Sequence, residues 1–167
     1  MKIHAVAPAS APLNLLTLAD PSAERVRAYL PYCQVFVGTE DGVAVAVAAV
    51  LGRPDEFELM AIAVAEARQG RGRGRQMLKH VLAFATANGA KRLVVGTGNS
   101  SLREQAFYRQ NGFERTGVIE SFFKDYDPPI VENGIRCLDM VRFSRETKPA
   151  GPSENNAAQS NRTNSAG

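Results

Sequence analysis

Three glycines alternate with larger residues in the segment Gln69-Gly70-Arg71-Gly72-Arg73-Gly74. A glycine-rich turn that leads into a helix gathers backbone N–H groups that have no partner inside the helix, and the helix dipole adds positive potential. Glycines let a phosphate group approach the backbone closely, because no Cβ stands in the way. The segment therefore predicts a binding site for a pyrophosphate.

Two well-known phosphate-binding sequences are excluded by the residues around these glycines. A P-loop needs Lys and then Ser or Thr after its last glycines, whereas Gly74 is followed by Arg75 and Gln76. The dinucleotide fingerprint G-x-G-x-x-G fails because Arg75 stands where its last glycine should be. Arginine-glycine segments that bind nucleic acid are usually longer and disordered. A solvated turn without a ligand stays open as the plain alternative.

The segment is flanked by the elements that such a site requires. Residues Glu56 to Val64 are mostly apolar and predict a strand that ends just before the glycines. From about Gly72 to Asn88, apolar residues recur at three- and four-residue steps and predict a helix. Asn88-Gly89 ends that helix, since both residues tolerate the left-handed conformation of a helix C-terminus.

Two carboxylates lie in the predicted strand before the glycines. Glu56 and Glu58 point to the same face of that strand, because side chains alternate with a period of two. A carboxylate in an otherwise apolar strand is costly unless it is exposed or paired. Each residue is therefore either a candidate for proton transfer or an ordinary exposed carboxylate near a strand end.

Helices and strands mix along the rest of the chain and predict one α/β (α+β) domain over residues 1–145. The hairpin signal Glu40-Asp41-Gly42 joins two apolar runs, and the second run is apolar on both faces, as expected of a central strand. The expected strands are Leu13 to Leu18, where the leucine-rich run also suits a helix, Cys33 to Gly38, Val43 to Leu51, Lys91 to Thr97, Phe113 to Phe122 and Ile135 to Phe143. The other expected helices run from Pro21, after an Asp20 N-cap, to about Leu30 and over Leu102 to Asn111, and a polar loop covers Asp125 to Asn133.

The composition supports a single domain with its own core, since 44% of the 167 residues are apolar. The longest apolar run, Val43 to Leu51, is far shorter than the about 20 residues of a membrane-spanning helix. No apolar stretch follows Met1-Lys2, so we expect a cytoplasmic protein that crosses no membrane. Residues 146–167 are rich in Pro, Gly, Ser, Asn and Ala, and they predict a disordered tail.

Metal and nucleic-acid binding have little support in the sequence. Cys33, Cys137, His4 and His80 match no metal-binding or redox spacing, so no metal is expected. The net charge of +3 is mildly positive and does not by itself imply nucleic acid.

Taken together, the motifs resemble those of the GNAT superfamily, the acetyl-CoA-dependent N-acetyltransferases. Gln69, Gly72 and Gly74 match the three specified positions of its signature Q/R-x-x-G-x-G/A, which follows the fourth strand. The segment Ala106-Phe107-Tyr108-Arg109-Gln110-Asn111-Gly112-Phe113 is similar to its second signature, A-x-x-F-Y-x-x-x-G-F, although Ala106 directly precedes Phe107 here. The run Gly96-Thr97-Gly98-Asn99 resembles the end of its fifth strand, and the resemblance covers about residues 13 to 144.

The resemblance implies a fold and a cosubstrate. The expected fold is a central mixed, mostly antiparallel sheet of six to seven strands, splayed between the fourth and fifth strands and flanked by helices. The expected cosubstrate is acetyl-CoA, held chiefly by backbone N–H groups of the fourth strand and of the following helix start. Its expected contacts are Ile62, Ala63, Val64, Gln69, Gly70, Arg71, Gly72, Arg73, Gly74, Arg75, Asn99 and Tyr108. The side chains of the arginines either pair with phosphates or lie exposed to solvent.

The resemblance also implies direct attack by an amine on the thioester. Tyr108 takes the position of the phenol that protonates the leaving thiolate, with packing at a helix end as the structural alternative. Glu58 lies 11 positions before Gln69, which is the offset of the catalytic base in the histone-acetylating branch. Glu56 competes for that role, and many relatives use a chain of water molecules instead.

The acceptor is less defined by the sequence. The loop Phe122 to Pro129 lies in a region that borders the acceptor site in this family, and its aromatics and carboxylates suit a cationic amine or simply face solvent. We expect an amine-bearing small molecule or protein as partner, no nucleic acid, and a monomer or homodimer. The alternative function is a non-catalytic acyl-CoA-binding regulatory module with the same fold.

Overall fold

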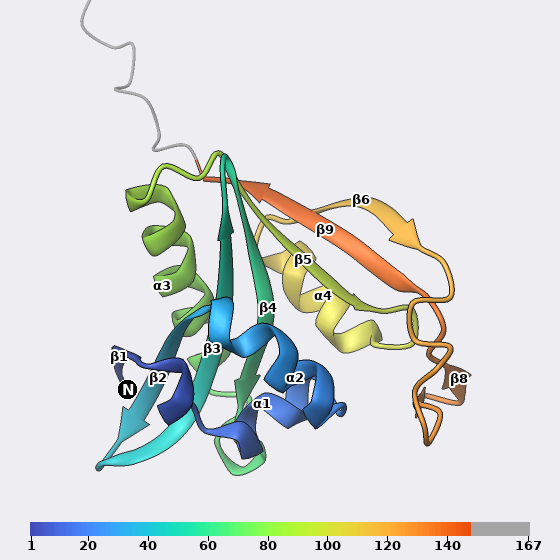
Figure 1. The fold of residues 1–167 in the computed structure, drawn as a ribbon, viewed down its shortest axis with the longest axis horizontal. Coiled ribbons are helices and arrows are strands. Elements are labelled where there is room, and N and C mark those ends of the chain that lie inside the picture. Colours follow the sequence, from blue (N-terminus) through green and yellow to red (C-terminus); the bar gives the residue numbers. More distant parts are fainter. Residues whose placement is uncertain (148–167) are drawn as a thin grey trace, which may run out of the picture.

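The strands form one large sheet and one small hairpin in the computed structural model, which describes residues 1–147 (Figure 1). The large sheet contains β1 (Lys2–Val6), β2 (Gln34–Glu40), β3 (Val43–Arg53), β4 (Glu56–Val64), β5 (Arg92–Gly98), β6 (Glu114–Ile119) and β9 (Met140–Glu146). The hairpin pairs β7 (Val131–Glu132) with β8 (Ile135–Arg136). The large sheet has the order β1-β2-β3-β4-β5-β9-β6, and within the described residues β4 and β5 are its one parallel pair.

The helices lie between these strands in the chain. They are α1 (Leu13–Ala19), α2 (Ala23–Tyr29), α3 (Arg73–Ala87) and α4 (Leu102–Gln110), with short 3-10 helices η1 (Pro8–Ser10), η2 (Leu30–Tyr32) and η3 (Glu66–Arg68). Within residues 1–147, none of the helices combines the length and the apolar character that crossing a membrane would require.

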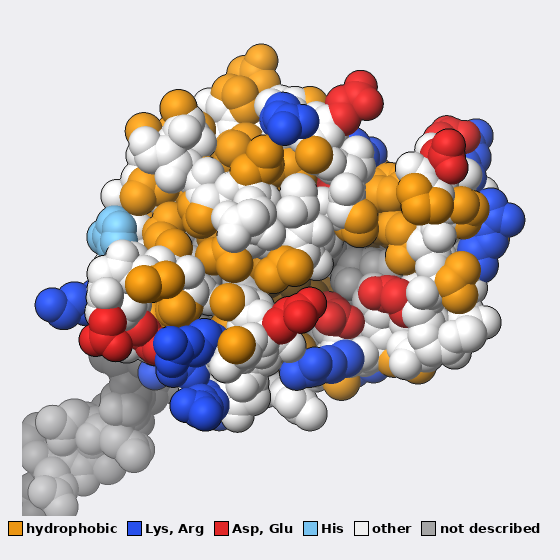
Figure 2. Space-filling model, turned by 90° about the horizontal axis from the view of Figure 1, so that it is seen from below, with side chains coloured by type: hydrophobic (Ala, Val, Ile, Leu, Met, Phe, Trp, Pro, Cys, Tyr) orange, Lys and Arg blue, Asp and Glu red, His pale blue; other side chains and the backbone are white. Residues whose placement is uncertain are grey.

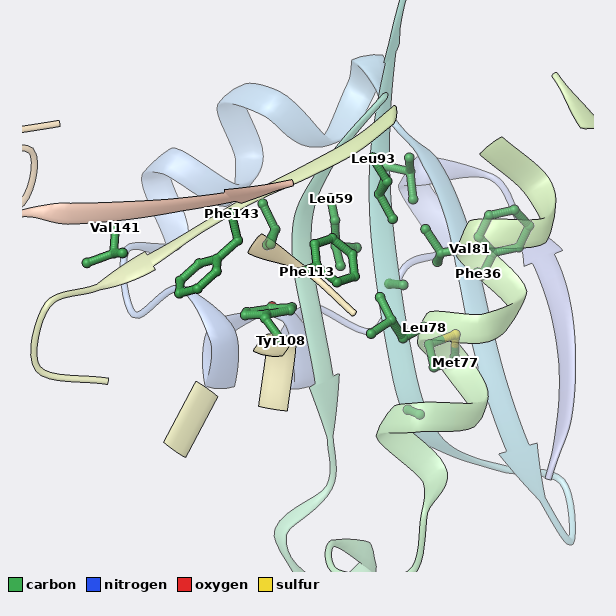
Figure 3. Packing of buried hydrophobic residues seen from close by; sticks show 14 residues of the cluster. Phe36, Leu59, Met77, Leu78, Val81, Leu93, Tyr108, Phe113, Val141 and Phe143 are labelled. Carbon is green, nitrogen blue, oxygen red and sulfur yellow. The ribbon is translucent and has the colours of Figure 1, made fainter. Parts of the chain in front are cut away.

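Each face of the sheet carries its own apolar core. On one face, α3 and α4 pack against the strands through Met77, Leu78 and Tyr108 (Figure 3). On the opposite face, α1 and α2 pack through Leu16 and Val26, both fully buried. The sheet is thus covered by α3 and α4 on one side and by α1 and α2 on the other.

The sheet consists of two wings that meet at the start of β4 and β5. Figure 1 shows β1 to β4 with α1, α2 and α3 in one wing, and β5, β9 and β6 with α4 in the other. The wings lie together where β4 and β5 begin and separate toward the ends of these strands. This mixed sheet, splayed between its fourth and fifth strands and flanked by helices, confirms the expected fold class.

The prediction for the N-terminal residues is wrong in two places. Leu13 to Leu18 is not a strand but lies in α1, where Leu15 and Leu16 reach the core and the Thr17 hydroxyl donates to the Leu13 carbonyl at 3.1 Å. β1 was not expected: it is a five-residue edge strand that leaves no residue fully buried. The first strand therefore precedes the leucine-rich run.

The start of α2 differs by two residues from the prediction. Ser22, not Asp20, is the N-cap, and its hydroxyl accepts from the backbone N–H of Arg25 at 3.3 Å. The Asp20 carboxylate accepts instead from the N–H of Ser22 at 3.0 Å, which fixes the connection between α1 and α2.

The expected last strand, Ile135 to Phe143, is divided in the structure. Its first residues form β8, which turns back on β7 through Asn133 and Gly134, both with positive φ. β9 then starts at Met140 and continues to Glu146, and Thr147 is buried, so ordered structure passes the expected boundary at residue 145. The rest of the expected disordered tail, 148–167, lies outside the described residues.

Candidate active site

β4 and β5 separate halfway along their length. Their parallel ladder covers residues 56–59 of β4 and 92–95 of β5, and both strands continue beyond it. A β-bulge in the β3–β4 ladder lies beside this point, and a bulge bends its strand. Beyond these residues, β4 and β5 therefore form no ladder hydrogen bonds with each other. Ile62, Ala63 and Val64, which the family resemblance predicts to contact acetyl-CoA, lie on the separated part of β4.

The glycine-rich turn connects the end of β4 to α3. Gly70 and Gly72 both have φ of +75°, a conformation that favours glycine, and a Cβ on either would meet nothing within 4 Å. None of the backbone N–H groups of residues 70–75 has a hydrogen-bond partner within residues 1–147. The turn therefore offers a row of free donors and open space at the N-terminus of a 15-residue helix.

The side chains of this turn have different partners. The Gln69 amide donates to the Val64 carbonyl at 3.0 Å and ties the turn to the end of β4. Arg75 donates to the side chain of Asn111 at 3.3 Å. Arg71 has no side-chain partner within residues 1–147, so it is the arginine most available to a phosphate. Arg73, in contrast, is already paired.

Arg73 and Glu40 form a two-fold hydrogen-bonded ion pair. Arg73 Nε and Nη2 donate to the two carboxylate oxygens at 2.6 and 2.8 Å, and Nη1 donates to the Arg68 carbonyl at 3.1 Å. The hydrogen bonds from Arg73 hold the pKa of Glu40 below its ordinary value, and nearby positive charges act in the same direction. The pair is therefore present above the ordinary carboxyl range and is lost as the pH falls through the lowered pKa. It links the first turn of α3 to the end of β2.

Tyr108 of α4 belongs to the apolar core on the α3–α4 face of the sheet. Its ring centre lies 5.6 and 6.1 Å from those of Phe113 and Phe143 (Figure 3). The ring centre of Phe107 lies 5.4 Å away. The side chain is 5% exposed, and its hydroxyl has no hydrogen-bond partner within residues 1–147. That hydroxyl is not among the fully buried unpaired atoms, so it reaches accessible space. Burial raises the pKa of Tyr108, and the charge of Glu104 adds to the effect, so the phenol stays protonated.

The two sequence motifs lie side by side. A Cβ placed on Gly74, in the first turn of α3, would lie 3.6 Å from the ring of Phe107. Phe107 directly precedes Tyr108, and the Arg75–Asn111 bond joins the same two helices. α4 ends at Gln110 with Asn111 as its C-cap, and Gly112 follows with φ of +80°. The fold thus brings the phosphate-binding candidate and the tyrosine to one region.

Glu58 and Glu56 are both ion-paired. Glu58 accepts from Arg142 of β9 at 2.7 Å, and its other oxygen lies 3.6 Å from Arg53 of β3. Glu56 is paired with Arg92 of β5 at 2.5 Å. Arg142 lies 84 residues from Glu58 in the chain, and nothing in the sequence predicts that the two residues pair. Leu59, the next residue of β4, belongs to the apolar core on the Tyr108 face of the sheet. Neighbouring side chains of a strand point to opposite faces, so Glu58 points to the α1–α2 face.

The side chain of Asn99, an expected cofactor contact, is hydrogen-bonded to the backbone of residues 136–139. Its Oδ1 accepts from the backbone N–H groups of Leu138 and Asp139 at 2.8 and 3.0 Å, and its Nδ2 donates to the Arg136 carbonyl at 3.2 Å. These bonds hold the segment between β8 and β9 against the end of β5. The geometry therefore favours a structural role, and the cofactor contact stays a prediction.

The loop after β6 faces the connection between α1 and α2. Tyr126 donates to Asp20 at 2.9 Å, and the guanidinium of Arg25 lies 4.4 Å from the ring centre of Phe122. The sequence indicated the loop but not its partners, because they lie about 100 residues earlier in the chain.

Other sites are less developed. Within residues 1–147, no group of three or more His, Cys, Asp or Glu side chains lies together in a way that would hold a metal ion. A hollow of about 570 Å³ lies at the other end of β4, and its lining includes Asp55, Lys91 and Glu56, the second candidate for the base. The separated ends of β4 and β5 fit the predicted chemistry better, because the turn with the free donors follows β4 there and Gly74 of that turn lies beside Phe107, the neighbour of Tyr108.

Comparisons with known proteins give consistent matches. The family model described as "Acetyltransferase (GNAT) family" matches residues 10–113. An uncharacterised N-acetyltransferase of Bacillus subtilis, YvbK, is 37% identical over 132 residues, which cover 78% of this chain and 85% of that protein.

Solved structures agree with the sequence matches. The structure of an IAA acetyltransferase from Bacillus cereus has a TM-score of 0.83 and 38% identity, covering 87% of this chain and 98% of that one. A GNAT family acetyltransferase from Elizabethkingia anophelis with acetyl-CoA bound has the same TM-score and identity, covering 87% and 97%.

Proposed function

The chain belongs to the GNAT family of acetyltransferases, and on that premise we propose that it transfers the acetyl group of acetyl-CoA directly to a primary amine of a small molecule or protein. The observation that carries the proposal is the row of unpartnered N–H groups over residues 70–75, next to the separated strands and Tyr108. The Elizabethkingia relative is described with acetyl-CoA bound, which supports the same cosubstrate here.

The residues fit the chemical groups of this cosubstrate. The N–H groups of residues 70–75 would hold the pyrophosphate, with Arg71 as a further positive charge. The separated edge of β4 at Ile62, Ala63 and Val64 would bind the pantetheine and polarise the thioester carbonyl. The open space at Gly70 and Gly72, where a Cβ would meet no atom, leaves room for the phosphates.

Two side chains of this chain would move protons. When bound, acetyl-CoA supplies a thioester whose carbonyl carbon accepts the amine and whose sulfur leaves as a thiolate. Tyr108 would donate its proton to that sulfur, since burial keeps the phenol protonated at neutral pH. Glu58, on the α1–α2 face, would take the proton of the amine directly or through water. The amine would therefore enter from the α1–α2 face and the cosubstrate from the α3 face.

An amine panel tests the proposed function. The full chain is incubated with acetyl-CoA and primary amines, and both free thiol and acetylated amine are measured. We expect the two products in equal amounts with at least one class of amine. Acetyl-CoA binding without thiol release for any amine would instead identify a non-catalytic acyl-CoA-binding module.

Glu58→Gln tests the candidate base. We expect kcat to fall at least about tenfold at neutral pH with unchanged affinity for acetyl-CoA, because the amide cannot accept the proton of the amine. Glu56→Gln is the matched control, since Glu56 is also ion-paired and lies two residues away on the same face. A loss confined to Glu56→Gln would move the role to Glu56, and equal losses would indicate that both ion pairs are structural.

Glu40→Gln tests whether the Arg73–Glu40 pair positions the phosphate-binding turn. We expect about fivefold weaker binding of acetyl-CoA, the size that a half-buried ion pair can supply. Asp55→Asn breaks an exposed ion pair, with Lys91, far from the turn, and should leave the affinity unchanged. Unchanged affinity of Glu40→Gln in calorimetric titrations would contradict the positioning role.

A further inference from the structure

The gap between the separated parts of β4 and β5 is closed at one end and open at the other. The two strands are paired up to Leu59 and Val95, and the glycine-rich turn lies past the other end of β4. Figure 2 views the molecule from below the orientation of Figure 1, where β4 ends, and shows a hollow between the two wings. A cosubstrate whose phosphates bind at the turn therefore enters the gap from its open end. Its acyl group, at the far end of the pantetheine arm, points toward the closed end.

On one side of this gap, β5 has glycines where other strands have side chains. Val95 belongs to the core on the α3–α4 face, so Gly96 and Gly98 face the opposite, α1–α2 side. Side chains of later residues take the place of the missing ones. A Cβ on Gly96 would overlap the sulfur of Met140 and lie 2.8 Å from its Cγ, and a Cβ on Gly98 would lie 2.5 Å from the sulfur of Cys137.

Met140 starts on β9 and extends over β5. In the β5–β9 ladder Met140 stands opposite Gly98, but its sulfur lies over Gly96, two residues nearer to the closed end of the gap. Gly96 is the first residue of β5 beyond the ladder with β4. The thioether therefore covers β5 at the point where the gap begins, on the α1–α2 side. The side chain is half-buried, so part of its surface is open to a ligand.

The candidate base lies next to Met140. Arg142, on the same face of β9, donates from Nη1 to Glu58 across β5 at 2.7 Å and to the sulfur of Met140 at 3.9 Å. In the proposed reaction the thioester carbonyl must lie near Glu58, because this carboxylate takes the proton of the attacking amine, directly or through water. The acyl chain that the carbonyl carries then lies beside the thioether of Met140.

We propose that Met140 limits the size of the acyl group that this protein transfers, so that acetyl is accepted and longer acyl chains are excluded. The inference rests on the proposed acetyl transfer and adds the selection of the donor. The methyl of an acetyl group ends before the thioether, whereas each further methylene needs space that Met140 fills. One methylene more or less in a fitted pocket changes selectivity by about 10- to 200-fold.

Three acyl donors and two substitutions of Met140 test this inference. Acetyl-CoA, propionyl-CoA and butyryl-CoA differ only in the methylene groups of the acyl chain. Met140→Ala removes the thioether, and Met140→Leu keeps an apolar side chain of similar volume. For each protein, calorimetry gives the Kd of each donor, and kcat/KM is measured with the amine that turns over fastest in the panel. The Kd reports on the space for the acyl chain even without turnover.

We expect the unaltered protein and Met140→Leu to prefer acetyl-CoA to butyryl-CoA at least about tenfold, both in Kd and in kcat/KM. Met140→Ala should reduce this preference to within about threefold, because the space of the thioether becomes available to the longer chain.

Ile119→Ala is the matched control for Met140→Ala. Ile119 lies directly opposite Met140 in the β6–β9 ladder, on the side away from β5 and the gap, and is 43% exposed. Its substitution removes a similar amount of apolar side chain next to Met140 and should leave the preference for acetyl-CoA unchanged. An equal change of preference in Ile119→Ala would show that the effect comes from a displaced β9.

The outcomes separate this inference from the proposed function. The inference is overturned, while acetyl transfer stands, if the unaltered protein binds butyryl-CoA as tightly as acetyl-CoA. It is also overturned if Met140→Ala keeps the preference or weakens all three donors equally. Absence of turnover with every donor and amine would contradict acetyl transfer itself, and the Kd values would still decide whether Met140 limits the acyl chain.

Discussion

Replacing Gly72 by valine is expected to raise the Kd for acetyl-CoA by roughly 100-fold or more, about 2.7 kcal/mol of binding free energy. Gly72 has φ of +75°, and its missing Cβ faces open space at the N-terminus of α3. A valine side chain would occupy the space in which the pyrophosphate must approach the N–H groups of residues 70–75. It would also strain the backbone and move those donors. Calorimetric titration with acetyl-CoA measures the effect.

Gly89→Val is the matched control for this substitution. Gly89 lies beyond the other end of α3, with φ of +78° and nothing within 4 Å of a Cβ. Both variants should therefore lose stability by a similar amount, about 1–2 kcal/mol, and show similar shifts in Tm. Only Gly72→Val should lose affinity. Equal Kd values for the two variants would contradict a phosphate-binding role of the turn.

Tyr108→Phe is expected to lower kcat by about 100-fold at neutral pH and to leave the Kd for acetyl-CoA nearly unchanged. The ring packs against Phe113 and Phe143, and phenylalanine preserves these contacts. What is lost is a hydroxyl without a protein partner, whose raised pKa keeps its proton available for a leaving thiolate. The change should therefore act on the chemical step. Steady-state kinetics combined with equilibrium binding separates the two parameters.

Tyr32→Phe serves as the control for Tyr108→Phe, because the same hydroxyl is removed from an exposed position. It should leave kcat and Kd unchanged. A weakened Kd with unchanged kcat in Tyr108→Phe would assign the tyrosine to binding. A large fall in Tm would show that the hydroxyl supports the core instead.

Local signals predicted the part of the fold that carries the cofactor candidate. The strand Glu56–Val64, the turn and the helix that follows were expected within one or two residues, because apolar periodicity and glycines act over short distances. The Leu13 to Leu18 run was assigned to a strand because leucines suit both types of element. The expected last strand was divided at residues 137–139, where the backbone N–H groups of Leu138 and Asp139 donate to the side chain of Asn99 instead of to a neighbouring strand.

The ion pairs and hydrogen bonds that connect the parts of the site could not be predicted from the sequence. Glu58 with Arg142, Arg73 with Glu40 and Tyr126 with Asp20 are separated by 84, 33 and 106 residues. Each depends on which strands become neighbours, and a single sequence carries no signal for that. The contacts of Tyr126 with Asp20 and of Phe122 with Arg25 were missed for the same reason, although the loop after β6 had been noticed.

A crystal structure of the protein with coenzyme A bound would show whether the turn and Tyr108 form the cosubstrate site. We expect pyrophosphate oxygens at hydrogen-bonding distance, about 2.9 Å, from N–H groups within residues 70–75. We also expect the sulfur between the separated ends of β4 and β5, within roughly 3.5 Å of the Tyr108 hydroxyl. Coenzyme A bound elsewhere, or a sulfur out of reach of Tyr108, would contradict this assignment.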